Sequence, residues 1–189
     1  MDTIAIPKPF HLTGTHAVYS GSDWSLSFGA VEEGGRGIDD LVLTSGSTAA
    51  TSATAAFTAA DTGKKISTVD GTGITDGTTM TYVSATQVTL SVAATVTGTY
   101  VASVRALNAS SYSTHSASAK RAEGDTTALC TFTIATARAA VGWFLFTLPE
   151  ATTEPLSGNG VWDWRVNDGT VTAYWLAGKV RFAKNVTET

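Results

Sequence analysis

The sequence predicts an all-β protein, and three observations lead to that prediction. Thr occurs 33 times and Ser 17 times among the 189 residues, and β-branched side chains such as Thr favour extended backbone because a helix restricts their χ1 angle. Several short stretches alternate apolar and polar residues with a period of two, which is typical of strands with one buried face. Turn signals that contain glycine, such as Asn167-Asp168-Gly169, separate these stretches.

The first clear strand is predicted at residues 23–28, where apolar and polar residues alternate. Residues 129–136 repeat the alternation, and one face of this strand carries Cys130, Phe132 and Ile134. Residues 142–148 (GWFLFTL) are apolar on both faces, so we expect a central strand that is covered on both sides.

A hairpin is predicted near the C-terminus. Residues 161–166 form its first strand, whose expected inward side chains are Trp162, Trp164 and Val166. The turn follows at residues 167–169, where glycine relieves the requirement for a positive φ. The return strand covers residues 170–176 and continues over 178–182, past a bulge that we expect at Gly178.

Residues 44–103 differ in composition from both flanks. They hold 17 of the Thr residues, but none of the five Trp residues, and no His, Cys, Pro or Arg. Such a shift predicts an inserted subdomain, with the main core built from the flanks 1–43 and 104–189. The most economical architecture is an immunoglobulin-like antiparallel β-sandwich with a small Thr-rich β insert.

Four short strands are predicted inside the insert, at residues 63–69, 80–84, 87–92 and 99–104. In the Ala-rich residues 49–60 we expect one helical turn, around residues 57–61. No other helix is predicted.

Composition excludes several classes of protein. No apolar run approaches the length of a membrane span, and residues 1–12 lack the apolar core of a signal peptide. A net charge of −4 argues against binding nucleic acid through a broad basic face. The single cysteine, Cys130, cannot form an internal disulfide or a zinc site, and its place on an apolar strand face predicts a buried, inert thiol.

Catalytic residues are sparse. His11, His16 and His115 have no partner at metal-ligand spacing, and Ser113 with His115 does not make a triad. We therefore predict packing or surface histidines, no catalytic residue, no cofactor, no metal site and no enzymatic activity.

Acidic residues offer one alternative. Glu32-Glu33 and Asp39-Asp40 flank the Gly-rich residues 34–37, and carboxylates on a flexible loop can bind Ca²⁺. A solvated turn is the favoured interpretation, because no D-x-D-x-D pattern is present, and it applies equally to Asp61, Asp70 and Asp76. Residues 70–73 (DGTG) lack the helix and lysine of a phosphate loop, so we interpret them as a turn. No pair of carboxylates can be placed in a glycosidase cleft from the sequence.

The five tryptophans allow two interpretations. Exposed rings could stack on sugars or fill pockets of a partner. Alternation with polar residues instead favours core positions for Trp24, Trp162 and Trp164.

The flanks, over residues 10–41 and 112–187, resemble the attachment domain of tailed-phage baseplate upper proteins and related small tail proteins. Ser20-Gly21-Ser22-Asp23-Trp24 is similar to the Gly-Asp-x-Trp opening of that family, and residues 37–41 (GIDDL) to its Ile-Asp-Leu step. Residues 161–164 (VWDW), the following turn, residues 175–182 (WLAGKVRF) and the final Val186-Thr187 follow the family's order, with Trp162 and Trp164 in place of Tyr and Leu.

The insert carries a second resemblance. Residues 57–64 (FTAADTGK), Gly73-Ile74, residues 77–79 and residues 87–91 (QVTLS) resemble a Thr-rich β module of phage tail fibres and virion surface proteins.

Both resemblances imply a structural protein of a tailed-bacteriophage virion, assembled in the cytoplasm of the bacterial host. Its expected place is the tail tip or baseplate, or that of a minor tail component held by protein–protein contacts, with a capsid decoration or head-fibre protein as the alternative. The implied partners are other virion proteins and copies of the chain itself, as a trimer or ring. A carbohydrate-binding module for host attachment, with a surface glycan as ligand, is the second alternative. Neither nucleic acid nor membrane is an expected partner.

Overall fold

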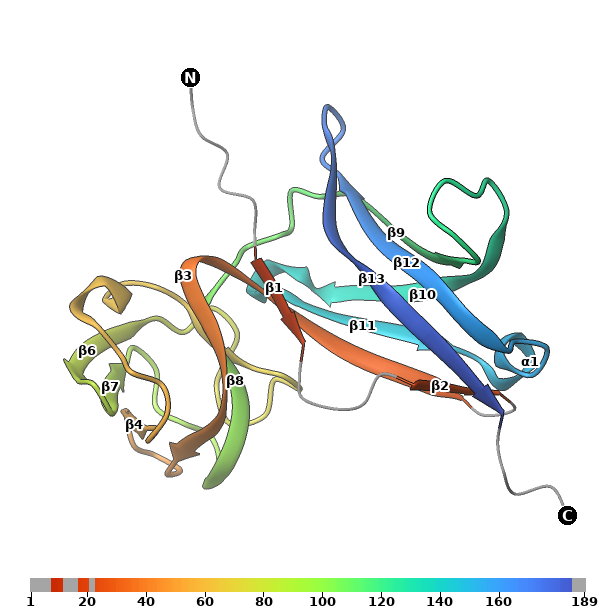
Figure 1. The fold of residues 1–189 in the computed structure, drawn as a ribbon. Helices are drawn as coiled ribbons and strands as arrows, with labels where there is room; N and C mark the ends of the chain where they lie inside the picture. The colour runs from red at the N-terminus through yellow and green to blue at the C-terminus, as the bar shows by residue number, and fades with distance from the viewer. Residues whose placement is uncertain (1–7, 12–16, 21–22, 185–189) are drawn as a thin grey trace, which may run out of the picture. The chain divides into compact units, whose positions relative to one another are not determined.

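Most strands form where apolar and polar residues alternate, and the protein is all-β with mostly antiparallel pairing. The computed structural model describes residues 8–11, 17–20 and 23–184 (Figure 1). His16, Gly21-Ser22 and Val186-Thr187, which were named above, lie outside these residues. The strands are β1 (Lys8–His11), β2 (Ala17–Ser20), β3 (Trp24–Leu43), β4 (Ala49–Thr51), β5 (Ile66–Thr68), β6 (Met80–Ser84), β7 (Gln87–Leu90), β8 (Gly98–Ala106), β9 (Thr114–Lys120), β10 (Ala128–Arg138), β11 (Trp143–Leu148), β12 (Gly158–Asn167) and β13 (Thr172–Lys184).

The chain divides into two compact units, and their boundaries differ from those expected from composition. Within the described residues, one unit comprises 8–11, 28–109 and 137–143, and we call it the barrel unit. The other comprises 17–20, 23–27, 110–136 and 144–184, and we call it the aromatic unit. The Thr-rich residues 44–103 are therefore part of a larger unit, because most of β3 and β8 pair within it.

The barrel unit is a ring of six strands in the order β5-β8-β3-β4-β7-β6. An antiparallel bridge between Lys65 and Thr79 closes the ring. The backbone N–H of Ile66 donates to the carbonyl of Thr78 at 3.1 Å, and the N–H of Met80 to that of Lys64 at 3.0 Å. Closure leaves few exposed strand edges, which suits a unit as small as this one.

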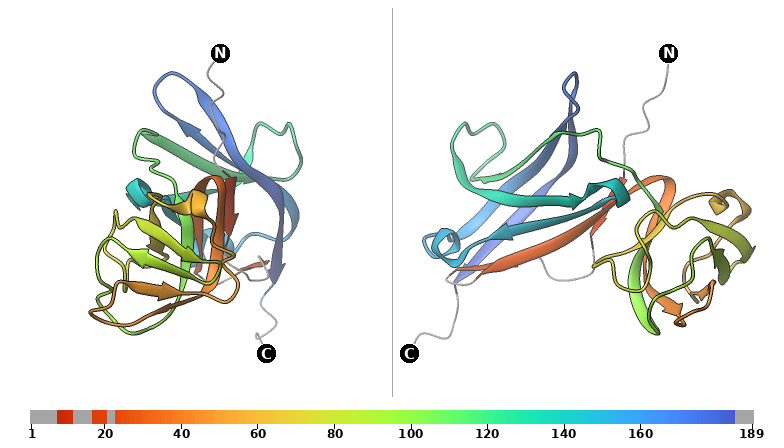
Figure 2. Two further views of the ribbon diagram at one scale, coloured as in Figure 1. Left: turned by 90° about the vertical axis from the view of Figure 1, so that its left-hand side faces the viewer. Right: turned by 180° about the vertical axis from the view of Figure 1, so that it is seen from behind.

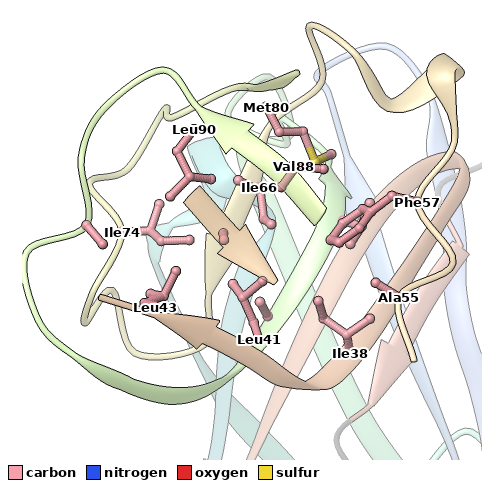
Figure 3. Packing of buried hydrophobic residues seen from close by; sticks show 14 residues of the cluster. Ile38, Leu41, Leu43, Ala55, Phe57, Ile66, Ile74, Met80, Val88 and Leu90 are labelled. Carbon is pink, nitrogen blue, oxygen red and sulfur yellow. The ribbon is translucent and has the colours of Figure 1, made fainter. Parts of the chain in front are cut away.

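Aliphatic side chains fill the ring (Figure 3). Leu41 and Leu43 point inward from β3, and Val88 and Leu90 do so from β7. The intervening Thr and Val side chains point outward, as the period of two requires. The remaining core members are Ile38, Ala50, Ala55, Phe57, Ile66, Ile74, Met80, Ala94, Ala102 and Val104.

Sequence periodicity located most of these strands. The strand over residues 80–84 has the predicted bounds, and β5, β7 and β8 fall at the predicted places. The helical turn expected near residues 57–61 is the 3₁₀ turn Ala59–Asp61. Strand β4 is missing from the prediction, because Ala has low strand propensity and only pairing with β3 and β7 makes residues 49–51 extended.

Residues 32–37 are not the solvated turn that the Gly-rich sequence suggested. They lie inside β3, where the pairing with β8 shifts between Val31 and Arg36. Gly34 has a φ of 73°, and a Cβ at Gly35 would lie 2.9 Å from the carbonyl oxygen of Val104. The glycines therefore permit a wide bulge that a residue with a side chain would obstruct.

Residues 137–143 join the barrel unit although they are distant from it in sequence. They contain the 3₁₀ turn Ala139–Val141, and the N–H of Ala30 donates to the carbonyl of Gly142 at 2.7 Å. A Cβ at Gly142 would lie 2.4 Å from the carbonyl oxygen of Ala30, so the close approach requires glycine.

The aromatic unit is a sheet with the strand order β2-β13-β12-β9-β10-β11-β3. Strands β11 and β12 are separated by two others, yet the rings of Phe146 and Trp164 have centroids only 5.0 Å apart. The sheet must therefore curl over its own core, and Figures 1 and 2 show β12 and β13 lying across from β11. Trp164, Phe132 and Trp175 are buried in this core.

The predicted hairpin is present, with a correction in one detail. Strands β12 and β13 pair antiparallel, and Gly169 in the turn has a φ of 97°. Trp164 pairs with Leu176 but Arg165 pairs with Tyr174, so the bulge lies at Trp175 and not at Gly178. The extra residue turns the indole of Trp175 into the core, where its ring centroid is 4.9 Å from that of Trp164.

Other predictions for the flanks were correct only in part. Trp164 and Phe132 are core residues as predicted, whereas Trp24 and Trp162 are only half-buried. Strand β11 is not covered on both faces, because Leu145 is 41% exposed. Two helical turns were missed, Ala139–Val141 and α1 (Glu150–Thr153), since each is too short to show a helical period.

Candidate functional site

The carboxylate of Asp40 accepts four hydrogen bonds from the loop that follows β4, at residues 52–54. The hydroxyl of Ser52 donates to one oxygen, and that of Thr54 donates to the same oxygen at 2.8 Å. The N–H groups of Ala53 and Thr54 donate to the other oxygen, at 2.8 and 3.0 Å. The hydrogen bond from Ser52 contributes most to lowering the pKa of Asp40. Its acceptor sites are therefore occupied by the chain itself, which leaves little capacity for a cation.

Asp61 is fully buried, which corrects the expectation of a solvated turn. Its carboxylate accepts hydrogen bonds from Arg105 Nε at 2.5 Å and from Arg36 Nη2 at 3.1 Å, and from the N–H of Thr58 at 2.8 Å. Burial alone would raise the pKa of Asp61, but the hydrogen bonds from Arg36, Arg105 and Thr58 outweigh it and hold the pKa below its usual value. No local sequence pattern indicates this cluster, because Arg36 and Arg105 lie far from Asp61 along the chain.

The two arginines also bind backbone. Arg36 donates to the carbonyls of Ala55 and Ala56, and Arg105 donates from Nη1 to the carbonyl of Glu33 at 2.9 Å. Arg105 adopts a φ of 59°, a left-handed conformation that costs a residue with a Cβ about 1–2 kcal/mol. The hydrogen bonds of this cluster therefore attach the 3₁₀ turn Ala59–Asp61 to β3 and β8. The carboxylate of Asp61 binds the charged groups of both Arg36 and Arg105.

Asp70 and Asp76 are likewise engaged within the barrel unit. Asp70 accepts the N–H of Thr72 at 2.8 Å, so residues 70–73 form the expected turn. Asp76 pairs with Arg138, whose Nη2 lies 2.5 Å from one carboxylate oxygen. Arg138 Nη1 donates to the carbonyls of Thr68 and Val69, at 2.8 and 2.7 Å, which attaches residues 137–143 to the barrel.

The remaining acids of β3 do not converge. Glu32 pairs with Lys64 at the surface, and Glu33 and Asp39 are exposed. Among the residues that the structure describes, no group of three or more His, Cys, Asp or Glu side chains is positioned to hold a metal ion.

The half-buried ring of His115 packs against the core of the aromatic unit. One ring nitrogen, Nε2, donates to the carbonyl of Tyr112 at 2.9 Å. The ring lies among Phe144, Trp164 and Trp175, with centroid distances of 5.0, 6.0 and 6.2 Å. Burial lowers the pKa of His115, and the hydrogen bond to Tyr112 opposes that shift. A neutral imidazole held by aromatic rings is a packing residue.

Cys130 is buried on β10, as predicted. Burial raises the pKa of its thiol, and a hydrogen bond with the backbone of Ala119 opposes the shift. Because the thiolate is the nucleophilic form, this cysteine is poorly suited to catalysis.

A shallow groove of about 450 Å³ in the aromatic unit lies at the start of β3. Its lining residues are Asp23, Trp24, Ser25, Thr133, Thr147, Leu148 and Pro149. One Asp23 oxygen accepts the N–H of Glu150 at 2.8 Å. Trp143, Trp164 and Trp175 are buried, which leaves Trp24 and Trp162 as the half-exposed rings that a sugar could reach.

The outer surface of the barrel offers a different kind of site, which we call the uncharged face. It consists of exposed side chains that point outward from five of the six strands of the ring, β8, β3, β4, β7 and β6, so it extends around the barrel. Its members are Val42, Ala49, Thr51, Thr81, Val83, Thr89 and Thr99. A groove of about 480 Å³ on the outside of the barrel unit is lined by three of these members and by neighbouring residues: Asp40, Val42, Thr51, Ser52, Ala53, Thr86 and Thr99. Hydroxyl and methyl groups dominate here, so the site is suited to contact and not to chemistry.

Comparison with known proteins gives no assignment, since no family model matches the sequence and no curated protein matches it significantly. In the described part of the chain, no helix has the length and apolar character needed to span a membrane.

Proposed function

We propose that the chain is a non-enzymatic structural protein of a tailed-bacteriophage virion, located at the tail tip or baseplate. The observation that carries the proposal is the resemblance of two separate segments to virion proteins, the flanks to an attachment domain and residues 57–91 to a Thr-rich surface module. The all-β fold agrees with both resemblances.

The chemistry of the side chains supports a structural role. Asp40 and Asp61 are engaged by neighbouring groups of the chain, and His115 and Cys130 have pKa values that favour their neutral forms. These groups stabilise the fold, and the exposed surface of the barrel unit is rich in hydroxyl and methyl groups that suit contacts with protein.

Immunogold electron microscopy of purified phage particles tests the proposal, with an antibody raised against the folded chain. The expected result is label at the tail tip. Label on the capsid would support the alternative of a decoration or head-fibre protein. Particles that carry no label, while the antibody still recognises the chain in the infected-cell lysate, would contradict both versions.

The carbohydrate-binding alternative has one specific observation in its favour, the half-exposed Trp24 at the hydroxyl-lined groove of the aromatic unit. Titration of the chain with host-surface polysaccharide, followed by tryptophan fluorescence, tests it. A saturable change that Trp24→Ala abolishes would favour this alternative, whereas an unchanged spectrum would remove it.

A further inference from the structure

The strands of the aromatic unit separate positive charges from most negative ones. Strands β9, β12 and β13 contain one acid, Asp163, and several cations, which are Lys120, Arg165, Lys179, Arg181 and Lys184. The other acids that the structure describes in this unit lie outside the strands, and they are Asp23, Glu123, Asp125, Glu150, Glu154 and Asp168. Arg165 Nε lies 3.3 Å from an oxygen of Asp163, so this pair adds no net charge to the sheet.

The register of the sheet brings three of these cations together. Val161 of β12 pairs with Lys120 of β9 on one side and with Lys179 of β13 on the other (Figure 1). Paired residues of antiparallel strands point to the same face of a sheet, and neighbouring strands are about 4.8 Å apart. The Cα atoms of Lys120 and Lys179 are therefore about 10 Å apart, with Val161 between them. Arg181 follows two residues after Lys179, so it points to the same face about 7 Å further along β13.

This set, which we call the basic face, is turned to solvent and comprises Lys120, Val161, Lys179 and Arg181. Lys179 and Arg181 are exposed, and Lys120 and Val161 are half-buried. The residues that alternate with them point into the core and are buried, namely Ala119, Val180 and Phe182. In the described part of the chain, no carboxylate forms an ion pair with any of the three cations. Like charges on neighbouring sheet positions repel one another, so the fold gains no stability from this arrangement.

We infer that the basic face binds an acidic segment of a partner protein. Carboxylates on such a segment would meet three cations that have no counter-charge within the described residues, and the opposite potentials would steer the partner to this face. Val161 lies between the two lysines, and lysine side chains carry aliphatic stems that cover neighbouring apolar surface. An apolar centre with a charged rim is typical of contacts between proteins. The inference does not depend on the virion proposal.

Two other anionic ligands fit this face less well. Among the described residues, a polysaccharide would find no tryptophan to stack on here, because Trp162 and Trp164 alternate with Val161 along β12 and point to the opposite face. Trp162 lies against Phe132 and Phe146 on that side, with ring centroids 6.0 and 6.4 Å away. A nucleic acid binds through a row of phosphate contacts, and three cations within about 12 Å provide too few of them.

Titration of the isotope-labelled full chain with a synthetic peptide rich in Glu and Val, followed by NMR, tests the inference. The backbone amide signals of Lys120, Val161 and Lys179 should shift until they saturate, while those of the barrel unit stay in place. The shifts should shrink when NaCl is added, because salt screens exposed charges. The double variant Lys120→Gln/Lys179→Gln removes two of the three charges, and it should weaken binding by about 5-fold.

The matched control is Lys64→Gln/Lys65→Gln, which changes the net charge by the same amount on the barrel unit and should leave the affinity unchanged. The amide spectrum of each variant without peptide shows whether its fold is intact. A peptide that shifts no signal of the basic face would overturn the inference, and so would equal weakening by the two double variants. Polygalacturonate and single-stranded DNA are the competing ligands, and tighter binding of either one to this face would overturn the assignment to a protein partner.

Discussion

The barrel unit and the aromatic unit are both mostly antiparallel β structures, but they exclude water in different ways. The barrel unit closes into a ring through Lys65 and Thr79, so medium-sized aliphatic side chains fill it. The aromatic unit is an open sheet that curls over its own core. Large rings such as those of Trp164 and Phe146 fill the space between its facing strands. The difference teaches that closure and side-chain volume substitute for each other in forming a small core.

The two units also treat ionisable groups differently. The barrel unit buries the Asp61 carboxylate with two arginines. The aromatic unit surrounds the neutral imidazole of His115 with rings. Acid should therefore affect the two units at different pH values, and substitutions in one should leave the other largely unchanged.

Deletion of residues 44–103, with a Gly/Ser bridge, is expected to have the largest effect, because it should remove the fold of one unit and leave the fold of the other. It removes most of the barrel but leaves the aromatic unit, whose near-UV circular dichroism should persist because loop closure costs little. It also exposes barrel core residues that lie outside the deleted range, namely Ile38, Leu41, Leu43 and Val104. The variant should therefore aggregate, and changing Ile38, Leu41 and Leu43 to Ser should restore solubility. Complete loss of the near-UV signal would mean that the aromatic unit cannot fold alone.

Trp164→Ala should destabilise the aromatic unit by about 3–5 kcal/mol, because it empties the centre of a closely packed ring cluster. Denaturant titration measures the change. Leu145→Ala is the matched control on the exposed face of β11, and we expect it to cost less than about 0.5 kcal/mol. A cost below about 1 kcal/mol for Trp164→Ala would show that the strand faces are reversed.

Asp61→Asn should destabilise the barrel unit by about 3 kcal/mol, because it leaves Arg36 and Arg105 without their shared counter-charge. Glu32→Gln is the control, since the Lys64–Glu32 pair is exposed and should contribute less than about 1 kcal/mol. Urea unfolding of the two variants measures both. Equal losses of unfolding free energy from the two substitutions would show that the buried cluster stabilises the fold no more than an exposed ion pair does.

Mild acid should affect the aromatic unit first. Because burial lowers the pKa of His115 in the folded state, the unfolded chain takes up a proton near pH 6.5 while the folded chain resists it. Stability is therefore fully present above about pH 6.5 and decreases as the pH falls below it, by at most about 1.4 kcal/mol per pH unit. The pKa values of Asp40 and Asp61 are lowered in the folded state. The barrel unit should therefore lose stability through these groups only when the pH falls below the usual pKa of an Asp side chain. Unfolding of His115→Gln should lose this dependence between pH 7 and pH 5, and an unchanged slope would assign the effect to another group.

Local pattern was enough to predict the parts of the fold that depend on periodicity. The strand over residues 80–84, the turn at residues 167–169 and the burial of Trp164 and Phe132 all follow from alternation and turn chemistry. Long-range contacts were not predictable in the same way. Arg138 binds Asp76 and the carbonyls of Thr68 and Val69, and nothing in its neighbourhood in the sequence indicates those partners.

The candidate site shows the same limit. The low charge of residues 44–103 is visible in the sequence, but the uncharged face exists only because the ring order brings β8, β3, β4, β7 and β6 together. The burial of Asp61 was missed for a related reason, since a single Asp in a Thr-rich segment looks solvated until Arg36 and Arg105 are placed around it.

A structural role in the virion is tested most directly by quantitative mass spectrometry of purified phage particles. The chain should co-purify with the particles at a fixed ratio to the other tail proteins, and it should stay attached through repeated washes, because a structural component is held by extensive protein contacts. A chain that is found in the soluble lysate but is absent from washed particles would contradict the proposed role.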